Sequence, residues 1–171
     1  GEGWHSPHEL SKEELNQLIG AYVAAAERAK RIGFDVLEVH SAHGYLLHQF
    51  LSPLANQRKD EYGKDRMKFP LEVATALRDT WPKDKALGTR INATDWVENG
   101  WQPENAVEYA KALKRAGLDF VCVSSGAVVG HARIKVEPGY QVGFAEQVRR
   151  AAQMPVMAVG MITRPKQAED I

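Results

Sequence analysis

Residues 33–45 read Gly33-Phe34-Asp35-Val36-Leu37-Glu38-Val39-His40-Ser41-Ala42-His43-Gly44-Tyr45, and this stretch decides the fold. The segment 34–39 is mainly apolar, contains β-branched side chains and follows a glycine, which is typical of a buried strand in a parallel sheet. Two histidines and a tyrosine come directly after this predicted strand. In α/β proteins ligands bind at the carboxyl ends of the strands, so the sequence predicts a binding site here.

Helical and extended patterns alternate on both sides of this stretch. Upstream, Ser11 and Glu14 form a capping box for an amphipathic helix that ends at Gly33. Downstream, we predict strands at 86–92, 118–124 and 155–159, helices at about 46–51, 70–81, 106–116 and 144–152, and a last helix that begins after Pro165. This order predicts a parallel sheet with crossover helices. Periodicity alone does not distinguish an open sheet from part of a barrel.

Composition excludes several classes of protein. The 171 residues include 22 Lys and Arg against 22 Asp and Glu, so the chain lacks the basic excess of a nucleic-acid-binding protein. No stretch approaches the about 20 consecutive apolar residues that span a bilayer, so no membrane partner is expected. The lone Cys122 excludes a disulfide framework and favours a cytoplasmic setting. Residues 1–9 lack an initiator methionine and resemble a loop, so we expect the chain to begin inside a fold.

His40 and His43 have three interpretations. Their i, i+3 spacing could direct both imidazoles at one metal ion, but no third ligand accompanies them at a suitable spacing, so we predict no metal site. The imidazoles could instead be structural and hydrogen-bonded to loop backbone. We favour a substrate-binding pair, because imidazoles donate hydrogen bonds well to a carbonyl or nitro oxygen.

Tyr45 and Arg90 each have a structural and a functional interpretation. The Tyr45 ring either packs and holds a loop, or its phenol gives a proton to a substrate carbon. Strand alternation over 86–92 places Arg90 on the same face as its neighbours two residues away, Gly88 and Asn92. A guanidinium on a buried strand needs an acceptor or an anion, and Glu38 is the candidate partner within the chain.

One segment resembles the signature of the Old Yellow Enzyme family of FMN-dependent ene-reductases. It reads Glu38-Val39-His40-Ser41-Ala42-His43-Gly44-Tyr45-Leu46-Leu47-His48-Gln49-Phe50-Leu51-Ser52-Pro53-Leu54-Ala55-Asn56-Gln57-Arg58-Lys59-Asp60-Glu61-Tyr62-Gly63. The His-x-x-His form is similar to the branch of thermophilic-like and xenobiotic reductases. The resemblance implies a (β/α)₈ barrel, which takes about 250 residues when complete. We therefore expect residues 1–171 to form a single partial barrel domain, with about strands four to seven and without the first three strands and the last.

The resemblance also implies a reaction and the residues that perform it. The family reduces activated C=C bonds of α,β-unsaturated carbonyl or nitro compounds, with FMN as cofactor and NADH or NADPH as reductant. The implied site comprises the substrate-binding residues His40 and His43, the catalytic proton donor Tyr45, and the cofactor-binding residues Arg90, Val159, Gly160 and Met161. The family pattern after Gly63 is longer than in this chain, and the strands that complete a flavin site lie outside the matched region.

Two rival hypotheses remain at this point. The chain could be a catalytically incompetent, cofactor-free barrel fragment that self-associates, since a sheet of four strands leaves two open edges for a second copy to cover. For this reason a homo-oligomer is expected. The chain could also belong to another phosphate-binding barrel enzyme, such as a sugar-phosphate isomerase or aldolase, but no lysine at a strand end is available for a Schiff base. A flavin-dependent demethylase or dienoyl-CoA reductase is a further possibility within the same family.

Overall fold

The structure, a computed structural model, describes residues 7–171, so most of the loop predicted for residues 1–9 lies outside the described part. One parallel sheet runs in the order β1-β2-β3-β4. Its strands are β1 (Val36–Ser41), β2 (Ala86–Asn92), β3 (Phe120–Ser124) and β4 (Val156–Ala158). Neighbouring strands are consecutive in the chain and helices separate them, which confirms the predicted parallel sheet with crossover helices.

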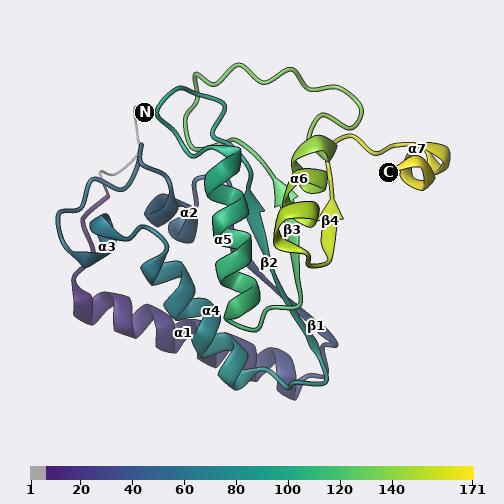
Figure 1. Cartoon of the computed structure of the whole chain (residues 1–171). Coiled ribbons are helices and arrows are strands. Elements are labelled where there is room, and N and C mark those ends of the chain that lie inside the picture. The colour runs from purple at the N-terminus through teal and green to yellow at the C-terminus, as the bar shows by residue number, and fades with distance from the viewer. Residues whose placement is uncertain (1–6) are drawn as a thin grey trace.

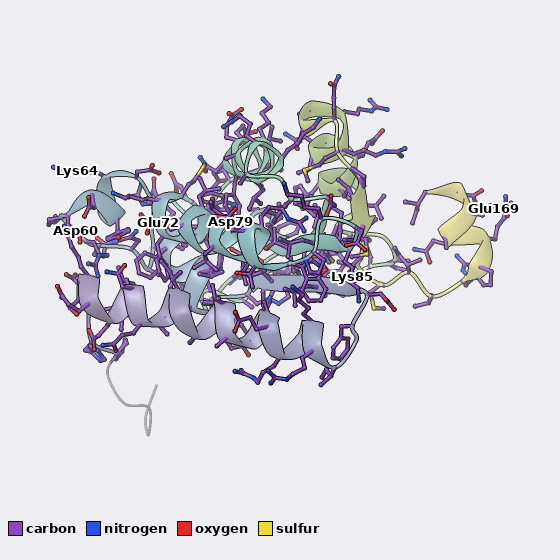
Figure 2. The ribbon with its side chains drawn as sticks, turned by 90° about the horizontal axis from the view of Figure 1, so that it is seen from below. Asp60, Lys64, Glu72, Asp79, Lys85 and Glu169 are labelled. Atoms are coloured by element: carbon purple, nitrogen blue, oxygen red, sulfur yellow. The ribbon has the colours of Figure 1, made fainter. Side chains whose placement is uncertain are left out.

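Along the chain, helices precede β1, connect the successive strands and follow β4 (Figure 1). They are α1 (Lys12–Arg31), α2 (Leu46–Leu51), α3 (Glu61–Lys64), α4 (Lys68–Thr80), α5 (Pro103–Arg115), α6 (Val142–Ala152) and α7 (Pro165–Asp170). Helix α7, which carries Glu169, buries no residue and stands apart from the other elements in both views (Figures 1 and 2). Within residues 7–171, no helix combines the length and the apolar character needed to cross a membrane.

Helix α1 forms as its sequence predicts. The Ser11 Oγ accepts from the Glu14 N–H at 3.2 Å, and Glu14 Oε2 accepts from the Ser11 N–H at 2.7 Å. Together these bonds make the predicted capping box and satisfy two amides that the first turn leaves free. Gly33, with φ +88°, follows the last turn in the left-handed conformation and turns the chain toward β1.

Two predictions in this half of the chain are wrong, namely the bounds of the first strand and the loop before α4. The strand predicted at 34–39 runs from Val36 to Ser41, because its parallel pairing with β2 continues until Ser41 lies opposite Ile91. His40 is therefore a strand residue and not the first residue of the following loop. The polar loop predicted before α4 contains the short helix α3, whose N-cap Asp60 accepts hydrogen bonds from the first free amides of the helix.

The two faces of the sheet have different surroundings. Leu87, Ile91 and Val121 belong to the face that the helices cover, and each is fully buried. The opposite face carries Glu38, His40, Arg90 and Phe120. This face is open in part, since Val36 and Met157 on it are 52% and 45% exposed. In a complete barrel this face would be the packed interior.

Candidate active site

A cavity of about 660 Å³ lies where the strands end, and the loop 125–141 contributes to its wall. Its lining includes six of the seven residues that the sequence singled out and three further polar side chains, namely His43, Tyr45, Arg90, Val159, Gly160, Met161, Ser124, Ser125 and Gln141. His40 does not line the cavity itself. Its ring centroid is 5.2 Å from that of His43 and 5.2 Å from that of Tyr45, so His40 lies directly behind two of the residues that line the cavity.

A tight turn after β1 sets the positions of His43 and Tyr45. The Tyr45 N–H donates to the carbonyl of Ala42 at 3.2 Å, and the His43 N–H donates to Asn92 Oδ1 at 3.2 Å. Gly44 adopts φ +73°, and a Cβ at this position would lie 2.8 Å from the carbonyl oxygen of Ala127. The turn therefore requires glycine and is held against both the end of β2 and the loop after β3.

The His43 imidazole already has a protein partner. Its Nε2 lies 2.8 Å from Ser124 Oγ, and Ser124 Oγ lies 3.4 Å from Gln141 Oε1. Ser125 Oγ donates to the same Gln141 oxygen. With Ser124 donating to Gln141, the proton of neutral His43 is on Nε2 and is donated to Ser124. A ligand oxygen that binds His43 Nε2 has to replace Ser124.

Arg90 projects from β2 with few partners. Its Nη2 is 3.5 Å from Ser124 Oγ, and its buried Nε has no hydrogen-bond partner among residues 7–171. No carboxylate in the described chain lies within ion-pair distance of Arg90, so the Glu38–Arg90 pair that the sequence left open does not form. Burial raises the pKa of Glu38, and the charge of Arg90 offsets part of this rise. A half-buried guanidinium without an anionic partner at a cavity suits an anionic or strongly accepting ligand.

Both site histidines are held in the neutral form. Partial loss of solvent, followed by the positive charge of Arg90, lowers the pKa of the largely exposed His40, and the same two causes lower the pKa of the half-buried His43 to about 4. A neutral imidazole offers one donor and one acceptor. The exposed His40 ring makes no hydrogen bond to the rest of residues 7–171, so its N–H is available to a ligand.

We expect the depressed pKa of His43 to make the chain less stable in mild acid. Between the ordinary histidine value of 6.5 and about 4, the unfolded chain binds this proton and the folded chain does not, so the free energy of unfolding falls as pH falls. His43→Gln should lose less stability than the wild type between about pH 7 and about pH 4.5 in urea unfolding. The exposed His131→Gln is the control, and an equal loss in wild type and His43→Gln would contradict the expectation.

Sequence reasoning missed two polar residues of this site. Gln141 is buried at the end of the loop 125–141 and accepts from Ser124 and Ser125. No local sequence pattern predicts these contacts. Asn92 could have been found, because alternation places this last residue of β2 on the face of Arg90. Its amide links the turn after β1 to the loop after β3, accepting from the His43 N–H and donating to the Gly126 carbonyl at 2.7 Å.

Parallel strands that alternate with helices and carry a polar cavity at their carboxyl ends define part of a β/α-barrel protein with its ligand site at the strand ends. The model of the NADH:flavin oxidoreductase / NADH oxidase family matches residues 2–171, and the chain belongs to this family. This result confirms the resemblance to the Old Yellow Enzyme family.

The individual relatives that the chain matches are longer than the chain. An NADPH dehydrogenase of Geobacillus thermodenitrificans is 48% identical over 169 residues, which are 97% of this chain and 49% of the relative. The chain thus spans about half the length of the curated relatives it matches.

Solved structures agree with this assignment. A 2-naphthoyl-CoA reductase in complex with 2-naphthoyl-CoA superposes with a TM-score of 0.87 at 29% identity, covering 95% of this chain and 26% of the other. Morphinone reductase superposes with a TM-score of 0.75 at 29% identity, covering 96% of this chain and 44% of the other. The predicted partial (β/α)₈ barrel is therefore confirmed as the fold class.

Proposed function

We propose that the complete protein is an FMN-dependent NAD(P)H oxidoreductase that reduces activated C=C bonds of α,β-unsaturated carbonyl or nitro compounds. The observation that carries this proposal is the cluster of His40, His43, Tyr45 and Arg90 around one cavity at the strand ends. Membership of the NADH:flavin oxidoreductase family and the names of its relatives, NADPH dehydrogenase and morphinone reductase, support it. The free, buried Cys122 supports a reducing, cytoplasmic setting.

We also propose that this chain is a single partial domain of that protein, without the first three barrel strands and the last. The open face of the sheet supports this division, because residues that would be packed inside a complete barrel are exposed. Val36 and Met157 are the clearest examples, at 52% and 45% exposure.

The residues around the cavity suit one side of an FMN molecule. Arg90 offers a buried Nε without a protein partner. Gly160 has φ +111°, a backbone conformation that favours glycine, and a Cβ there would lie 3.0 Å from Gln141 Nε2. Arg90 and the backbone at Val159, Gly160 and Met161 would hold the cofactor. When bound, FMN supplies the hydride-transfer chemistry, with a nicotinamide nucleotide as reductant.

His40 and His43 would bind the carbonyl or nitro oxygen of the substrate. As the β-carbon gains a hydride, negative charge develops on this oxygen, and hydrogen-bond donors placed beforehand stabilise that charge. Neutral imidazoles can donate in this way without adding further positive charge beside Arg90. To bind the substrate oxygen, the His43 Nε2–H would break its hydrogen bond to Ser124 Oγ. His40 has no hydrogen-bond partner within residues 7–171 to lose and would break a hydrogen bond to solvent only.

Tyr45 would give the proton that completes the reduction at the α-carbon. Its side chain is 64% exposed, and its hydroxyl has no partner among residues 7–171. In the complete FMN-loaded protein, we expect Tyr45→Phe to slow the oxidation of reduced flavin by 2-cyclohexen-1-one by about 10²-fold, the usual contribution of a general acid. Reduction of the flavin by NADPH should change little. Stopped-flow absorbance measures each half-reaction separately.

The control for this experiment is Tyr22→Phe, which removes a hydroxyl on α1 outside the residues that line the cavity. It should leave both half-reactions at their wild-type rates. Equal slowing of both half-reactions by Tyr45→Phe would contradict the proton-donor role.

A second candidate function is self-association of a cofactor-free chain. Phe34, Val36 and Met157 are 56%, 52% and 45% exposed, and apolar side chains of this size favour contact with another surface. We propose a homo-oligomer on this basis. Absorbance and sedimentation of the purified chain distinguish the two candidates, because bound FMN colours the protein yellow, whereas a cofactor-free oligomer is colourless.

A further inference from the structure

Two ionisable side chains are buried beneath the turn that carries His43 and Tyr45, outside the cavity. They are His48, in α2, and Asp95, in the loop after β2, and both side chains are 0% exposed. His48 Nε2 lies 3.2 Å from Asp95 Oδ1. In the described chain neither of these two buried atoms makes a well-aligned hydrogen bond, so the 3.2 Å contact between them is the polar contact on which each depends. Burying a carboxylate is costly, and the arrangement therefore calls for a physical explanation.

The remaining polar atoms of both side chains have partners. His48 Nδ1 accepts from the Gly44 N–H at 2.9 Å, which leaves the proton of a neutral ring on Nε2, facing Asp95. Asp95 Oδ2 accepts from Ser52 Oγ at 2.7 Å and from the Trp101 N–H at 2.8 Å. Burial alone would raise the pKa of Asp95, but the donors from His48, Ser52 and Trp101 outweigh burial and lower it. Asp95 is thus a carboxylate that orients the His48 ring.

We infer that His48 and Asp95 are positioning residues that hold the turn at Gly44, and with it the neighbouring His43 and Tyr45. Asp95 fixes the His48 tautomer, and His48 in turn fixes the Gly44 amide. Gly44 already requires a left-handed backbone and lies against Ala127. Loss of the pair would therefore free the Gly44 N–H and the link from the turn to the loop after β2, and would leave the bond from Gln49 Nε2 to the Gly44 carbonyl at 2.8 Å as the remaining side-chain contact from α2. The geometry of this link is independent of any ligand, whereas its effect on catalysis rests on the proposed function.

Asp95→Asn tests the link with little change in size. The asparagine oxygen can still accept from Ser52 and Trp101, but its NH₂ group then faces the His48 Nε2–H, so that two donors oppose each other. If His48 moves its proton to Nδ1, this donor opposes the Gly44 N–H instead. In either tautomer, one of the two contacts that connect Asp95 to Gly44 through His48 is lost.

Asp79→Asn is the matched control. It makes the same chemical change at an exposed side chain of α4 that has no hydrogen bond or ion pair in the described chain, and Asp79 is labelled in Figure 2. Both variants can be studied in the full 171-residue chain.

Nitrogen NMR and amide hydrogen exchange measure the link directly. In the wild type, we expect His48 to show a protonated Nε2 and an unprotonated Nδ1. Asp95→Asn should speed exchange of the Gly44 amide by about tenfold or more relative to the Val121 amide in β3, because a lost buried hydrogen bond costs about 1–3 kcal/mol. Asp79→Asn should leave this ratio unchanged.

Two results would overturn the inference: an Nδ1-protonated His48 in the wild type, or an unchanged Gly44 exchange ratio in Asp95→Asn. If Asp95→Asn does not fold, the wild-type tautomer decides alone, since an Nε2-protonated ring supports the link and an Nδ1-protonated ring refutes it.

The catalytic consequence is measured in the complete FMN-loaded protein. Asp95→Asn should raise KM for 2-cyclohexen-1-one by about tenfold while kcat per bound flavin falls less, because the histidines are displaced and not removed. A merely structural lesion would reduce the amount of loaded enzyme and leave KM unchanged, which would contradict positioning. If the protein binds no FMN, the proposed function fails, and the NMR results still decide the His48–Asp95 link.

Discussion

Replacing Phe69 with alanine is expected to lower the free energy of unfolding by about 3–5 kcal/mol. Phe69 lies in the first turn of α4 and is fully buried. Its ring centroid is 4.6 Å from that of Phe50 and 6.2 Å from that of Tyr62, so the three rings form one cluster between α2, α3 and α4. Truncation would leave a cavity that the neighbouring rings cannot fill. Since domains are commonly stable by about 5–15 kcal/mol, most of the stability would be lost.

Phe34→Ala is the matched control, because it deletes the same ring from a side chain that is 56% exposed. Its effect should remain within about 0.5 kcal/mol. Urea unfolding of both variants and the wild type, followed by tryptophan fluorescence, gives the two differences. Equal losses would show that the cluster around Phe69 is not the part of the core that the structure indicates.

The sequence predicted those elements whose formation is governed by local pattern. The strand at 86–92 and the short helix at 46–51 have the predicted boundaries, since apolar periodicity and flanking turn residues define them. The end of β1 was misplaced because pairing with β2, about fifty residues later in the chain, extends the strand through His40 and Ser41. Helix α3 was missed because four residues carry no periodicity, and only the cap at Asp60 marks it.

The site was predictable only in part for a related reason. His43, Tyr45 and Arg90 stand at strand ends, where sequence pattern directs attention. His48 resembles an ordinary residue of a short helix, and its partner Asp95 is 47 positions away, so their contact exists only after β1 and β2 are paired. Buried polar contacts between distant segments depend on tertiary packing, and hydrophobic periodicity in a single sequence does not predict them.

Arg90→Met is expected to weaken FMN binding to the complete protein by about 30-fold or more, because loss of one buried charged partner costs about 2–5 kcal/mol. Arg90 Nε is buried and without a protein partner, so the wild-type protein gains this interaction only when a ligand supplies an acceptor. Quenching of flavin fluorescence during titration gives the affinity. The same substitution should raise the pKa of His43, since the charge of Arg90 is one of the causes that lower it.

Arg90→Lys separates the two contributions of the guanidinium. Lysine keeps the positive charge but not the planar set of donors, so the pKa of His43 should stay low while FMN binding weakens. If Arg90→Met raises the pKa of His43 but FMN binds as tightly as in the wild type, Arg90 serves only to keep the substrate-binding histidine neutral, and its cofactor-binding role is wrong. If neither quantity changes, the guanidinium does not act on this cavity, although it lines the same wall as His43 and Gly160. One measurement gives the affinity for FMN and the other gives the pKa of His43. The two variants together therefore test whether Arg90 acts on both the cofactor and the substrate-binding histidine.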